Sequence, residues 1–311
     1  CNYKSINFMA KHGRGLICLA MTKNQIEKLK IPLMSSANKS RMQTAFTISI
    51  EAKKGITTGI SAYDRAKTIK VAINNRSTKN DIVSPGHVFP LVARSGGVLE
   101  RAGHTEASVD ISKLSKLNQS AVICEVMNED GRMARLKDLK RFSSKHKIKI
   151  ASIEDLIAYR LKNEILISKI GNKKLSNKKS DNYEFLTYLN RLDTSKNFVI
   201  KKGNFLSSKS IRVRVISTKI NASSVNLSDK KIKKSLNYLS KFNNFALIII
   251  TNKRKNIDEM GSNTLRYYGI GAQIIKDLKI RKMILVTRTR KKIIGLEGFG
   301  LKIKKQEIIK W

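Results

Sequence analysis

The sequence predicts an α+β (mixed α/β) protein with two domains. Its 311 residues suffice for two domains that each bury a core, and its 41% hydrophobic content is ordinary for a globular protein. Strand-like alternation and helix caps occur in turn along the chain. Residues 171–182 then contain almost no apolar side chain. We therefore expect a first domain over residues 1–162, a solvated linker over 163–182 and a second domain over 183–311.

Five segments carry local signals for individual elements. Thr44–Glu51 alternates with period two, which predicts a strand, and Ser61–Ile69 begins at a Ser or Asp cap, which predicts a helix. Ala121–Met127 is apolar and ends at turn residues, which predicts another strand. Ser152–Arg160 opens with a capping pattern typical of a helix. In the second domain, we expect a strand, a helix and a strand over Tyr268–Val286.

The formal net charge of +40 raises the question of a nucleic-acid partner. The excess is spread over both halves, with a net of +16 in residues 1–162 and +24 in residues 163–311. Aromatic residues make up only 6%, and no zinc finger or RNA-binding motif is present. We expect no specific nucleic-acid partner, and we attribute the charge to a Lys-, Asn- and Ile-rich composition that attracts anions in general.

Nothing in the sequence indicates a membrane segment or a structural metal site. The longest apolar run, Phe245–Ile250, is too short to span a bilayer, and no signal-peptide pattern occurs. Cys1, Cys18 and Cys124 lack metal-ligand spacing, so we expect reduced thiols. These features predict a cytoplasmic protein without a membrane partner.

Three polar segments stand out in the first domain. His87 lies between Pro85 and Pro90, residues 96–106 combine glycines with charged side chains, and Glu125 interrupts an apolar run. Each has an ordinary structural interpretation: a hydrogen-bonded histidine, a glycine turn, or a strand glutamate that faces solvent. Together, they indicate a site for an anion and a metal ion.

Within the second of these segments, the residue types suit phosphate and metal binding. The guanidinium of Arg101 can bind a phosphate through two hydrogen bonds, and Thr105 can add a hydroxyl. A neutral ring nitrogen of His104 can ligate a divalent ion.

Seven motifs then follow one another over residues 8–160. They are Phe8–Cys18, Gly55–Arg65, Pro85–Pro90, Gly96–Leu99, Arg101–Glu106, Cys124–Glu125 and Asp130–Arg135. In this order they resemble the 3,4-dihydroxy-2-butanone 4-phosphate synthase family. The resemblance implies an α/β sandwich, a role in riboflavin biosynthesis, and conversion of D-ribulose 5-phosphate to L-3,4-dihydroxy-2-butanone 4-phosphate and formate. It also implies dependence on Mg (or Mn) and a homodimer with sites at its interface.

The resemblance also assigns roles to residues. It implies that His87 and Glu125 are catalytic and that His104 is a metal ligand. The implied substrate-binding residues are Thr58, Arg101, Ala102, Gly103, His104 and Thr105. These roles suit a reaction that removes a proton beside a carbonyl group and stabilises an enediolate.

One part of the family pattern has no counterpart in these 311 residues. In the family, an acidic stretch before the segment at Phe8 supplies a further metal-binding glutamate and further substrate contacts. We therefore expect little synthase activity from the chain as it stands. The alternative is a catalytically impaired pseudoenzyme or a scaffold of the riboflavin pathway.

The second domain resembles GTP cyclohydrolase II, clearly over about residues 264–309. The similarity lies in Arg266–Leu278, Lys282–Thr287 and Lys292–Leu301. In that family, three cysteines bind zinc after a Val-Arg-Val-His stretch. Here Arg212–Ile216 is followed by Ser217–Leu239, which contains neither Cys nor His.

Other cyclohydrolase parts are missing as well. Thr264 stands where the family has an Asp, and the family's Gly-rich loop is unrecognisable at Asn252–Gly261. Thr287 and Lys292 keep positions that contact nucleotide in the family. We expect no zinc and no cyclohydrolase activity, so this domain is predicted to be a scaffold.

Overall fold

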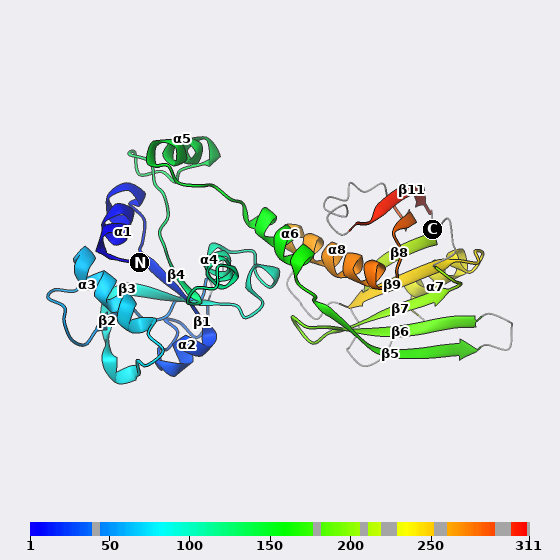
Figure 1. The fold of residues 1–311 in the computed structure, drawn as a ribbon, viewed down its shortest axis with the longest axis horizontal. Helices are drawn as coiled ribbons and strands as arrows, with labels where there is room; N and C mark the ends of the chain where they lie inside the picture. The colour runs from blue at the N-terminus through cyan, green and yellow to red at the C-terminus, as the bar shows by residue number, and fades with distance from the viewer. Residues whose placement is uncertain are drawn as a thin grey trace. The chain divides into compact units, whose positions relative to one another are not determined.

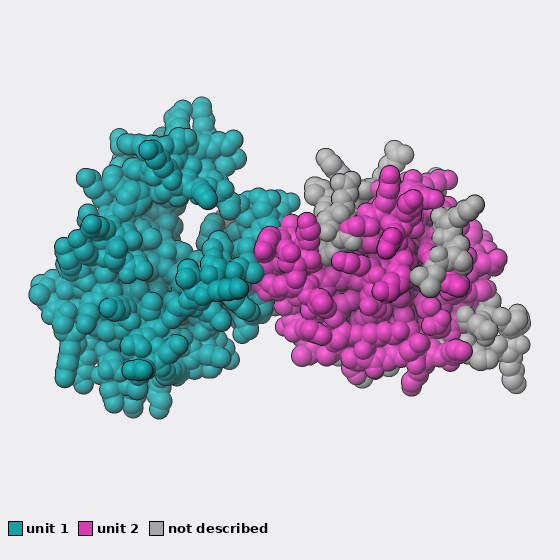
Figure 2. All heavy atoms as spheres, viewed as in Figure 1, with its two compact units in different colours: residues 1–156 teal, residues 157–311 magenta. Residues whose placement is uncertain are grey.

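The computed structural model describes residues 1–38, 44–176, 182–205, 211–218, 229–251, 260–289 and 300–309. The chain divides into two compact units, residues 1–156 and 157–311 (Figure 2), and each is described by itself. Both combine helices with a sheet, so the predicted α+β class with two domains is confirmed.

Unit 1 is built on a four-stranded mixed sheet in the order β2-β3-β1-β4 (Figure 1). Its central pair, β1 and β3, is parallel, and the two outer strands are antiparallel to their neighbours. The strands are β1 (Cys18–Thr22), β2 (Ile50–Ala52), β3 (Ile82–Ala93) and β4 (Ser120–Ile123). The helices are α1 (Tyr3–Phe8), η1 (Met9–Gly13), α2 (Lys23–Lys28), α3 (Ala62–Ala72), η2 (Lys79–Asp81), η3 (Gly97–Leu99), α4 (His104–Leu114) and α5 (Leu136–His146).

The core of unit 1 lies between this sheet and helices α1, α2 and α3. Leu19 and Met21 of β1 and Val88 of β3 pack with Ile6 of α1 and Ile69 of α3, all of them buried. Because β1 lies between two other strands and under helices, its residues are apolar without alternation.

Unit 2 contains a seven-stranded sheet in the order β11-β10-β8-β9-β7-β6-β5 (Figure 1). Strands β5, β6, β7 and β9 pair antiparallel, and β9, β8, β10 and β11 pair parallel. The strands are β5 (Ile167–Ser176), β6 (Asn182–Asn190), β7 (Lys196–Lys202), β8 (Ile211–Thr218), β9 (Phe245–Thr251), β10 (Lys282–Thr287) and β11 (Lys302–Ile308). The helices are α6 (Ile153–Asn163), which spans the division between the units, α7 (Lys230–Leu239) and α8 (Met260–Asp277).

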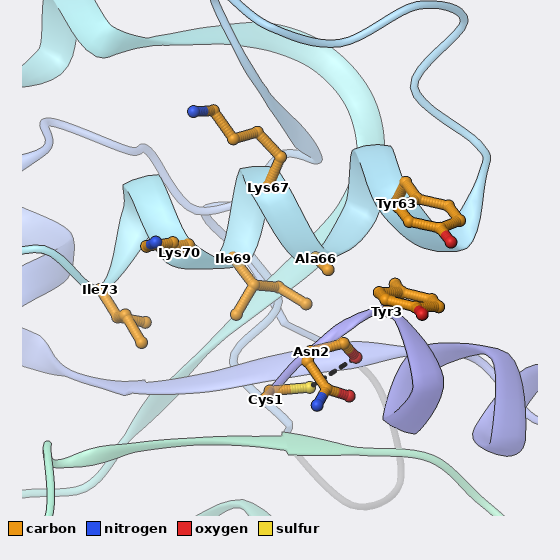
Figure 3. A pocket seen from close by; sticks show the side chains of 9 residues that line it. All are labelled: Cys1, Asn2, Tyr3, Tyr63, Ala66, Lys67, Ile69, Lys70 and Ile73. Atoms are coloured by element: carbon orange, nitrogen blue, oxygen red, sulfur yellow. Dashed lines mark hydrogen bonds between the residues drawn. The ribbon is translucent and has the colours of Figure 1, made fainter.

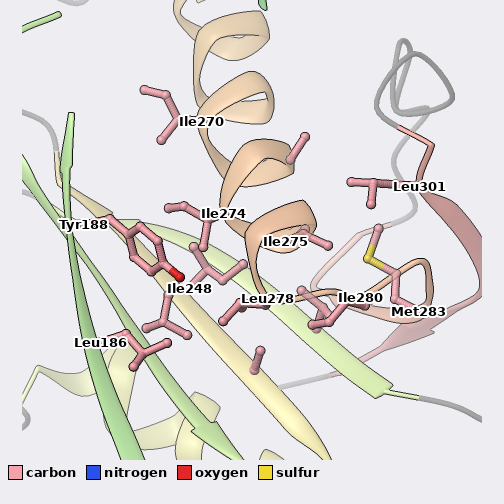
Figure 4. Packing of buried hydrophobic residues seen from close by; sticks show 14 of the residues in the cluster. Leu186, Tyr188, Ile248, Ile270, Ile274, Ile275, Leu278, Ile280, Met283 and Leu301 are labelled. Carbon is pink, nitrogen blue, oxygen red and sulfur yellow. The ribbon is translucent and has the colours of Figure 1, made fainter. Parts of the chain in front are cut away.

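Strand β9 is buried along its whole length because helices cover both faces of the sheet. Its even-numbered residues, such as Ile248, pack with Ile270 and Ile274 of α8 (Figure 4). Its odd-numbered residues pack with Ile232 and Leu239 of α7. The continuous apolar run that the sequence shows here is therefore a central strand.

The structure differs from the expected linker over residues 163–182. Ile167–Ser176 forms the edge strand β5, which pairs with β6. Edge pairing needs only main-chain groups, so an edge strand can contain Gly and can turn Lys and Asn side chains toward solvent. Charge on an edge strand also opposes aggregation. Over Ile167–Ser176, low apolar content therefore marked an exposed strand and not a linker, and residues 177–181 of the expected linker lie outside the described residues.

Helix α6 packs on α8 within unit 2. The Gln273 side chain donates to the carbonyls of Leu161 and Glu164 at 2.9 and 2.7 Å and accepts from the amide of Leu166 at 2.9 Å. A Cβ on Gly269 would lie 2.4 Å from Leu161 Cδ2, so the glycine permits the close approach. The expected end of the first domain at residue 162 thus falls in a helix that packs against unit 2.

The predicted helices over 61–69 and 152–160 are confirmed as α3 and α6. The predicted strands are shorter than expected, since β2 holds only the end of Thr44–Glu51 and β4 ends before Glu125. Arg14, on the facing segment, has a left-handed backbone and pairs with Val126 only as an isolated bridge, which ends the ladder. The strand expected at Tyr268 is part of α8 instead.

Cys1, Cys18 and Cys124 are free thiols, and burial raises the pKa of Cys18 to about 12. Among the described residues, none of the helices is both long enough and apolar enough to cross a bilayer.

Candidate active site

His87 lies on β3 beside the neighbouring strand β2, whose Glu51 contacts it directly. The Nδ1 atom of His87 and the Oε1 atom of Glu51 are joined by a hydrogen bond. The side chain of Glu51 is 15% exposed and that of His87 is 43% exposed. The imidazole is thus held on one side and accessible on the other. The sequence did not single out Glu51, because a glutamate at the end of a predicted strand is unremarkable.

The loop that carries Thr58 lies against this pair. Thr58 is exposed, and a Cβ on the following Gly59 would lie 2.8 Å from His87 Nδ1. Asp64 of α3 fixes the loop by accepting from the Thr57 amide and hydroxyl at 3.2 and 2.8 Å and from the Gly59 amide at 3.1 Å. The structure therefore brings Thr58 and His87 to one place.

The Asp64 carboxylate gives this loop a pH dependence. The hydrogen bond from the Thr57 side chain, with further bonds from loop amides, lowers the pKa of Asp64. A lowered folded-state pKa means that the stabilisation is present above pH about 4 and is lost as the pH falls through the lowered pKa. We expect Asp64→Asn to loosen the loop at neutral pH, seen as faster hydrogen exchange of the Gly59 amide and a higher KM for substrate. Unchanged exchange at Gly59 would contradict this role.

Glu125 follows β4 on the opposite side of β1 from His87. Its Oε2 atom accepts from the Leu16 amide at 2.9 Å, and the residue is exposed. A Cβ on Gly15 would lie 2.6 Å from the Glu125 carbonyl oxygen, so glycine is needed for the segment to pass so closely. The carboxylate is held by a backbone donor and faces outward.

Strand register places His87 and Glu125 at the same end of the sheet. Cys18 of β1 pairs with Phe89 of β3 and with Ile123 of β4. Extending both registers by two residues places Leu16 between His87 and Glu125, and the Leu16 amide does donate to the Glu125 carboxylate. Two inter-strand spacings put their backbones about 10 Å apart. A substrate of several carbons can lie between such groups.

The segment from Arg101 to Thr105 lies at the start of α4. Arg101 Nη1 donates to Glu106 Oε2 at 2.6 Å and its Nη2 donates to Thr44 Oγ1 at 3.1 Å. Glu106 Oε1 in turn accepts from the Arg94 amide, just after β3, at 3.0 Å. Gly103 is the N-cap of α4, and the following His104 is exposed.

These contacts place the α4 segment at the far end of β3 from His87. Ala93, the last residue of β3, is six positions after His87. Six positions correspond to roughly 20 Å of extended strand. Within one chain, therefore, His87, Glu125 and Thr58 form one group, and Arg101, Ala102, Gly103, His104 and Thr105 form another. The side chains that the sequence predicts to form one site therefore do not all meet within a single chain, because His87 and Glu125 lie apart from Arg101, His104 and Thr105.

His104 is the residue that the sequence predicts as a metal ligand. His104 is exposed at a helix start, where its ring nitrogens are accessible. No group of three or more His, Cys, Asp or Glu side chains suited to hold a metal ion occurs among the described residues. The neighbouring Glu106 is buried and bound to Arg101. The described residues of one chain do not complete a metal site.

A cavity of about 410 Å³ lies elsewhere on unit 1, between the chain start and α3 (Figure 3). The rings of Tyr3 and Tyr63 stack beside it with centroids 4.0 Å apart, and Lys67 and Lys70 lie along its wall. None of the predicted site residues lines it.

In unit 2, the second family's nucleotide positions are only partly described. Thr287 is the last residue of β10 and is buried. Its hydroxyl has no hydrogen-bond partner among the described residues. Lys292 and residues 252–259 of the loop expected at Asn252–Gly261 lie outside the described residues, as do the side chains of Thr264 and Arg266.

Comparisons with known proteins show the family of each part of the chain. The family model of 3,4-dihydroxy-2-butanone 4-phosphate synthase matches residues 1–159, and that of GTP cyclohydrolase II matches residues 241–308. The riboflavin biosynthesis protein RibBA of Aquifex aeolicus is 42% identical over 99% of this chain and 83% of its own length. The 3,4-dihydroxy-2-butanone 4-phosphate synthase of Photobacterium phosphoreum is 39% identical over 96% of this chain and 87% of its own.

A solved structure resembles the whole chain. RibBX, a two-domain 3,4-dihydroxy-2-butanone 4-phosphate synthase from A. baumannii, matches with a TM-score of 0.84 at 33% identity, over 99% of this chain and 89% of that one. The fold and these similarities define a two-domain lyase of riboflavin biosynthesis. The chain belongs to the 3,4-dihydroxy-2-butanone 4-phosphate synthase family and carries a GTP cyclohydrolase II-like domain.

Proposed function

We propose that His87 and Glu125 carry the proton transfers that convert D-ribulose 5-phosphate to L-3,4-dihydroxy-2-butanone 4-phosphate and formate. The observation that carries this assignment is their position across one end of the sheet, with Leu16 between them. His87 is fixed on its Nδ1 side by Glu51, and Thr58 lies on the loop beside it.

The chemistry needs a base and an acid within reach of one substrate. A proton leaves a carbon beside the carbonyl group to give an enediolate, and loss of water, rearrangement, addition of a water and release of formate follow, so that no water is lost overall. Each step needs a group that can accept or donate a proton near neutral pH. The outward ring nitrogen of His87 suits the first transfer, and the Glu125 carboxylate suits a transfer on the opposite side of the substrate.

The α4 segment completes the site from a second subunit in this proposal. His104 and the backbone at the start of α4 suit binding of an anion, because a helix start presents free amide groups. These residues lie too far along β3 to meet His87 of their own chain. A homodimer with two-fold symmetry would bring the α4 start of each subunit to the His87 end of the other.

We further propose that the reaction requires a divalent ion, Mg or Mn, with His104 as one ligand. Bound ion would stabilise the negative charge of an enediolate oxygen. No step is assigned through it, since the described residues of one chain hold no group of three or more candidate ligands.

Formate release from ribulose 5-phosphate tests this function. With Mg we expect release that stops on addition of EDTA and returns with Mg or Mn. A parallel incubation with GTP and zinc is expected to show neither GTP consumption nor zinc uptake, because the second domain is proposed to be a scaffold. Formate release that persists in EDTA would contradict the metal proposal, and GTP consumption would contradict the scaffold. The absolute rate of formate release tests the expectation, drawn from the sequence, that synthase activity is weak.

A further inference from the structure

We propose that Glu51 is a positioning residue that holds the His87 imidazole in a single tautomer for proton transfer. The proposal rests on the proposed function of His87 and adds a second carboxylate to that end of the sheet. In this role Glu51 acts only through the ring of His87, which its side chain contacts.

The backbone directs Glu51 to this position. Ile50 of β2 pairs with Val88 of β3, but Glu51 pairs with Val83, so the register shifts at this point. Such an irregularity bends a strand and re-aims a side chain. The Glu51 side chain turns onto His87, which is only one residue from the partner of Ile50.

The contact decides which ring nitrogen carries the proton. An ionised carboxylate can only accept a hydrogen bond, so Glu51 Oε1 requires a proton on His87 Nδ1. In the neutral ring, Nε2 then keeps its lone pair and can act as a base. Because the Glu51 side chain is 15% exposed and that of His87 is 43% exposed, the pair has an inner anchor and an outer reactive end.

The Gly59 backbone closes over the contact. A Cβ at this position would lie 1.6 Å from Glu51 Oε1 and 2.8 Å from His87 Nδ1, and the φ of Gly59 is +86°. Both the conformation and the space therefore require glycine. Asp64, the other carboxylate nearby, is committed to the Thr57 and Gly59 amides. Glu51 is therefore the carboxylate that contacts the His87 ring.

A purely structural ion pair is the competing explanation, and it predicts different results. If the pair only stabilised the sheet, neutralising Glu51 would lower thermal stability and leave turnover of the folded protein intact. If Glu51 fixes the tautomer, neutralisation changes kcat more than KM, since the ground-state substrate contacts stay in place.

The experiment compares Glu51→Gln and Glu51→Asp with the unsubstituted chain. Glu27→Gln serves as the matched control, because Glu27 forms an exposed ion pair with Lys23 on α2. Steady-state formate release gives kcat and KM. Nitrogen-15 NMR of histidine-labelled protein gives the His87 tautomer, with the His87→Asn spectrum identifying its signals. Circular dichroism confirms folding of each variant.

We expect the Nδ1-protonated tautomer in the unsubstituted chain and a mixture in Glu51→Gln. An amide can also donate to Nδ1, so kcat should fall about 10- to 100-fold, as for other partners that orient an imidazole. KM should change less than about threefold. Glu51→Asp keeps a carboxylate on a shorter side chain, so its kcat should lie between those of the unsubstituted chain and Glu51→Gln. Glu27→Gln should have the kcat and KM of the unsubstituted chain.

Two results would overturn the proposal. One is an Nε2-protonated His87 in the unsubstituted chain, and the other is a folded Glu51→Gln variant with unchanged kcat. Failure of the proposed function looks different: His87→Asn would then keep its kcat. In that case the positioning role falls with it, while the NMR spectrum still reports whether the Glu51 contact exists.

Discussion

Mixed dimers of His87→Asn and His104→Asn subunits are expected to regain formate release that neither variant supports alone. His87 and His104 lie at opposite ends of β3, so a complete site needs His87 from one subunit and His104 from the other. In a mixed dimer, one site combines both defects and the other has none. Both side chains are exposed, so neither substitution should unfold the chain.

The expected size of the effect is large. Loss of a general acid or base slows a reaction about 100- to 10,000-fold, so the background of His87→Asn is low. An isolated mixed dimer has one intact site out of two, which gives about half of the unsubstituted activity. The rates are measured after the two variants are co-expressed with different tags and the mixed dimers are isolated.

The control is the same mixing with two differently tagged samples of one variant, which should recover nothing. A site built within one chain would give no recovery in any mixture, since every subunit would carry one defect. Absence of recovery in verified mixed dimers would therefore contradict the shared site.

Much of the fold could be predicted from the sequence because local signals and tertiary packing agree. The Ser61 cap starts α3, and the apolar run at Phe245–Ile250 is a central strand covered on both faces. The error at Ile167–Ser176 has a physical cause, since a polar edge strand and a polar linker have the same composition. Pairing with β6 decides between them, and pairing is a long-range property.

The sequence identified the site residues by their place in motifs, but it did not show where they lie in space. His87, Glu125 and Thr58 could be named, but it is strand register that puts His87 and Glu125 at one end of the sheet, and the approach of Gly59 to His87 that brings the Thr58 loop there. Glu51 carried no signal because its role depends on a register shift between β2 and β3. The separation of His87 from His104 likewise follows from the length of β3, which motif spacing does not reveal.

Replacing Arg101 with Met is expected to destabilise unit 1 by about 3–5 kcal/mol, because it leaves a buried carboxylate without its cation. The Arg101 side chain is 13% exposed and that of Glu106 is 1% exposed, with 2.6 Å between Nη1 and Oε2. Glu106→Gln in the same chain should recover much of the loss, since a neutral amide can still accept from Arg94. Arg132→Met is the matched control, because the Arg132 side chain is 85% exposed in its pair with Asp130. That control should cost under about 0.5 kcal/mol.

Hydrogen exchange of α4 peptides across a urea series measures this effect within unit 1, which matters because two units can unfold separately. The result also separates two roles for Arg101. A large loss of stability that Glu106→Gln relieves would mean that Arg101 mainly fixes the start of α4, and with it His104 and Thr105. A stable Arg101→Met variant with a greatly raised KM would instead support direct contact with the substrate phosphate. The contacts of Arg101 with Glu106 and Thr44 favour the first outcome, because they already engage both terminal nitrogens of the guanidinium.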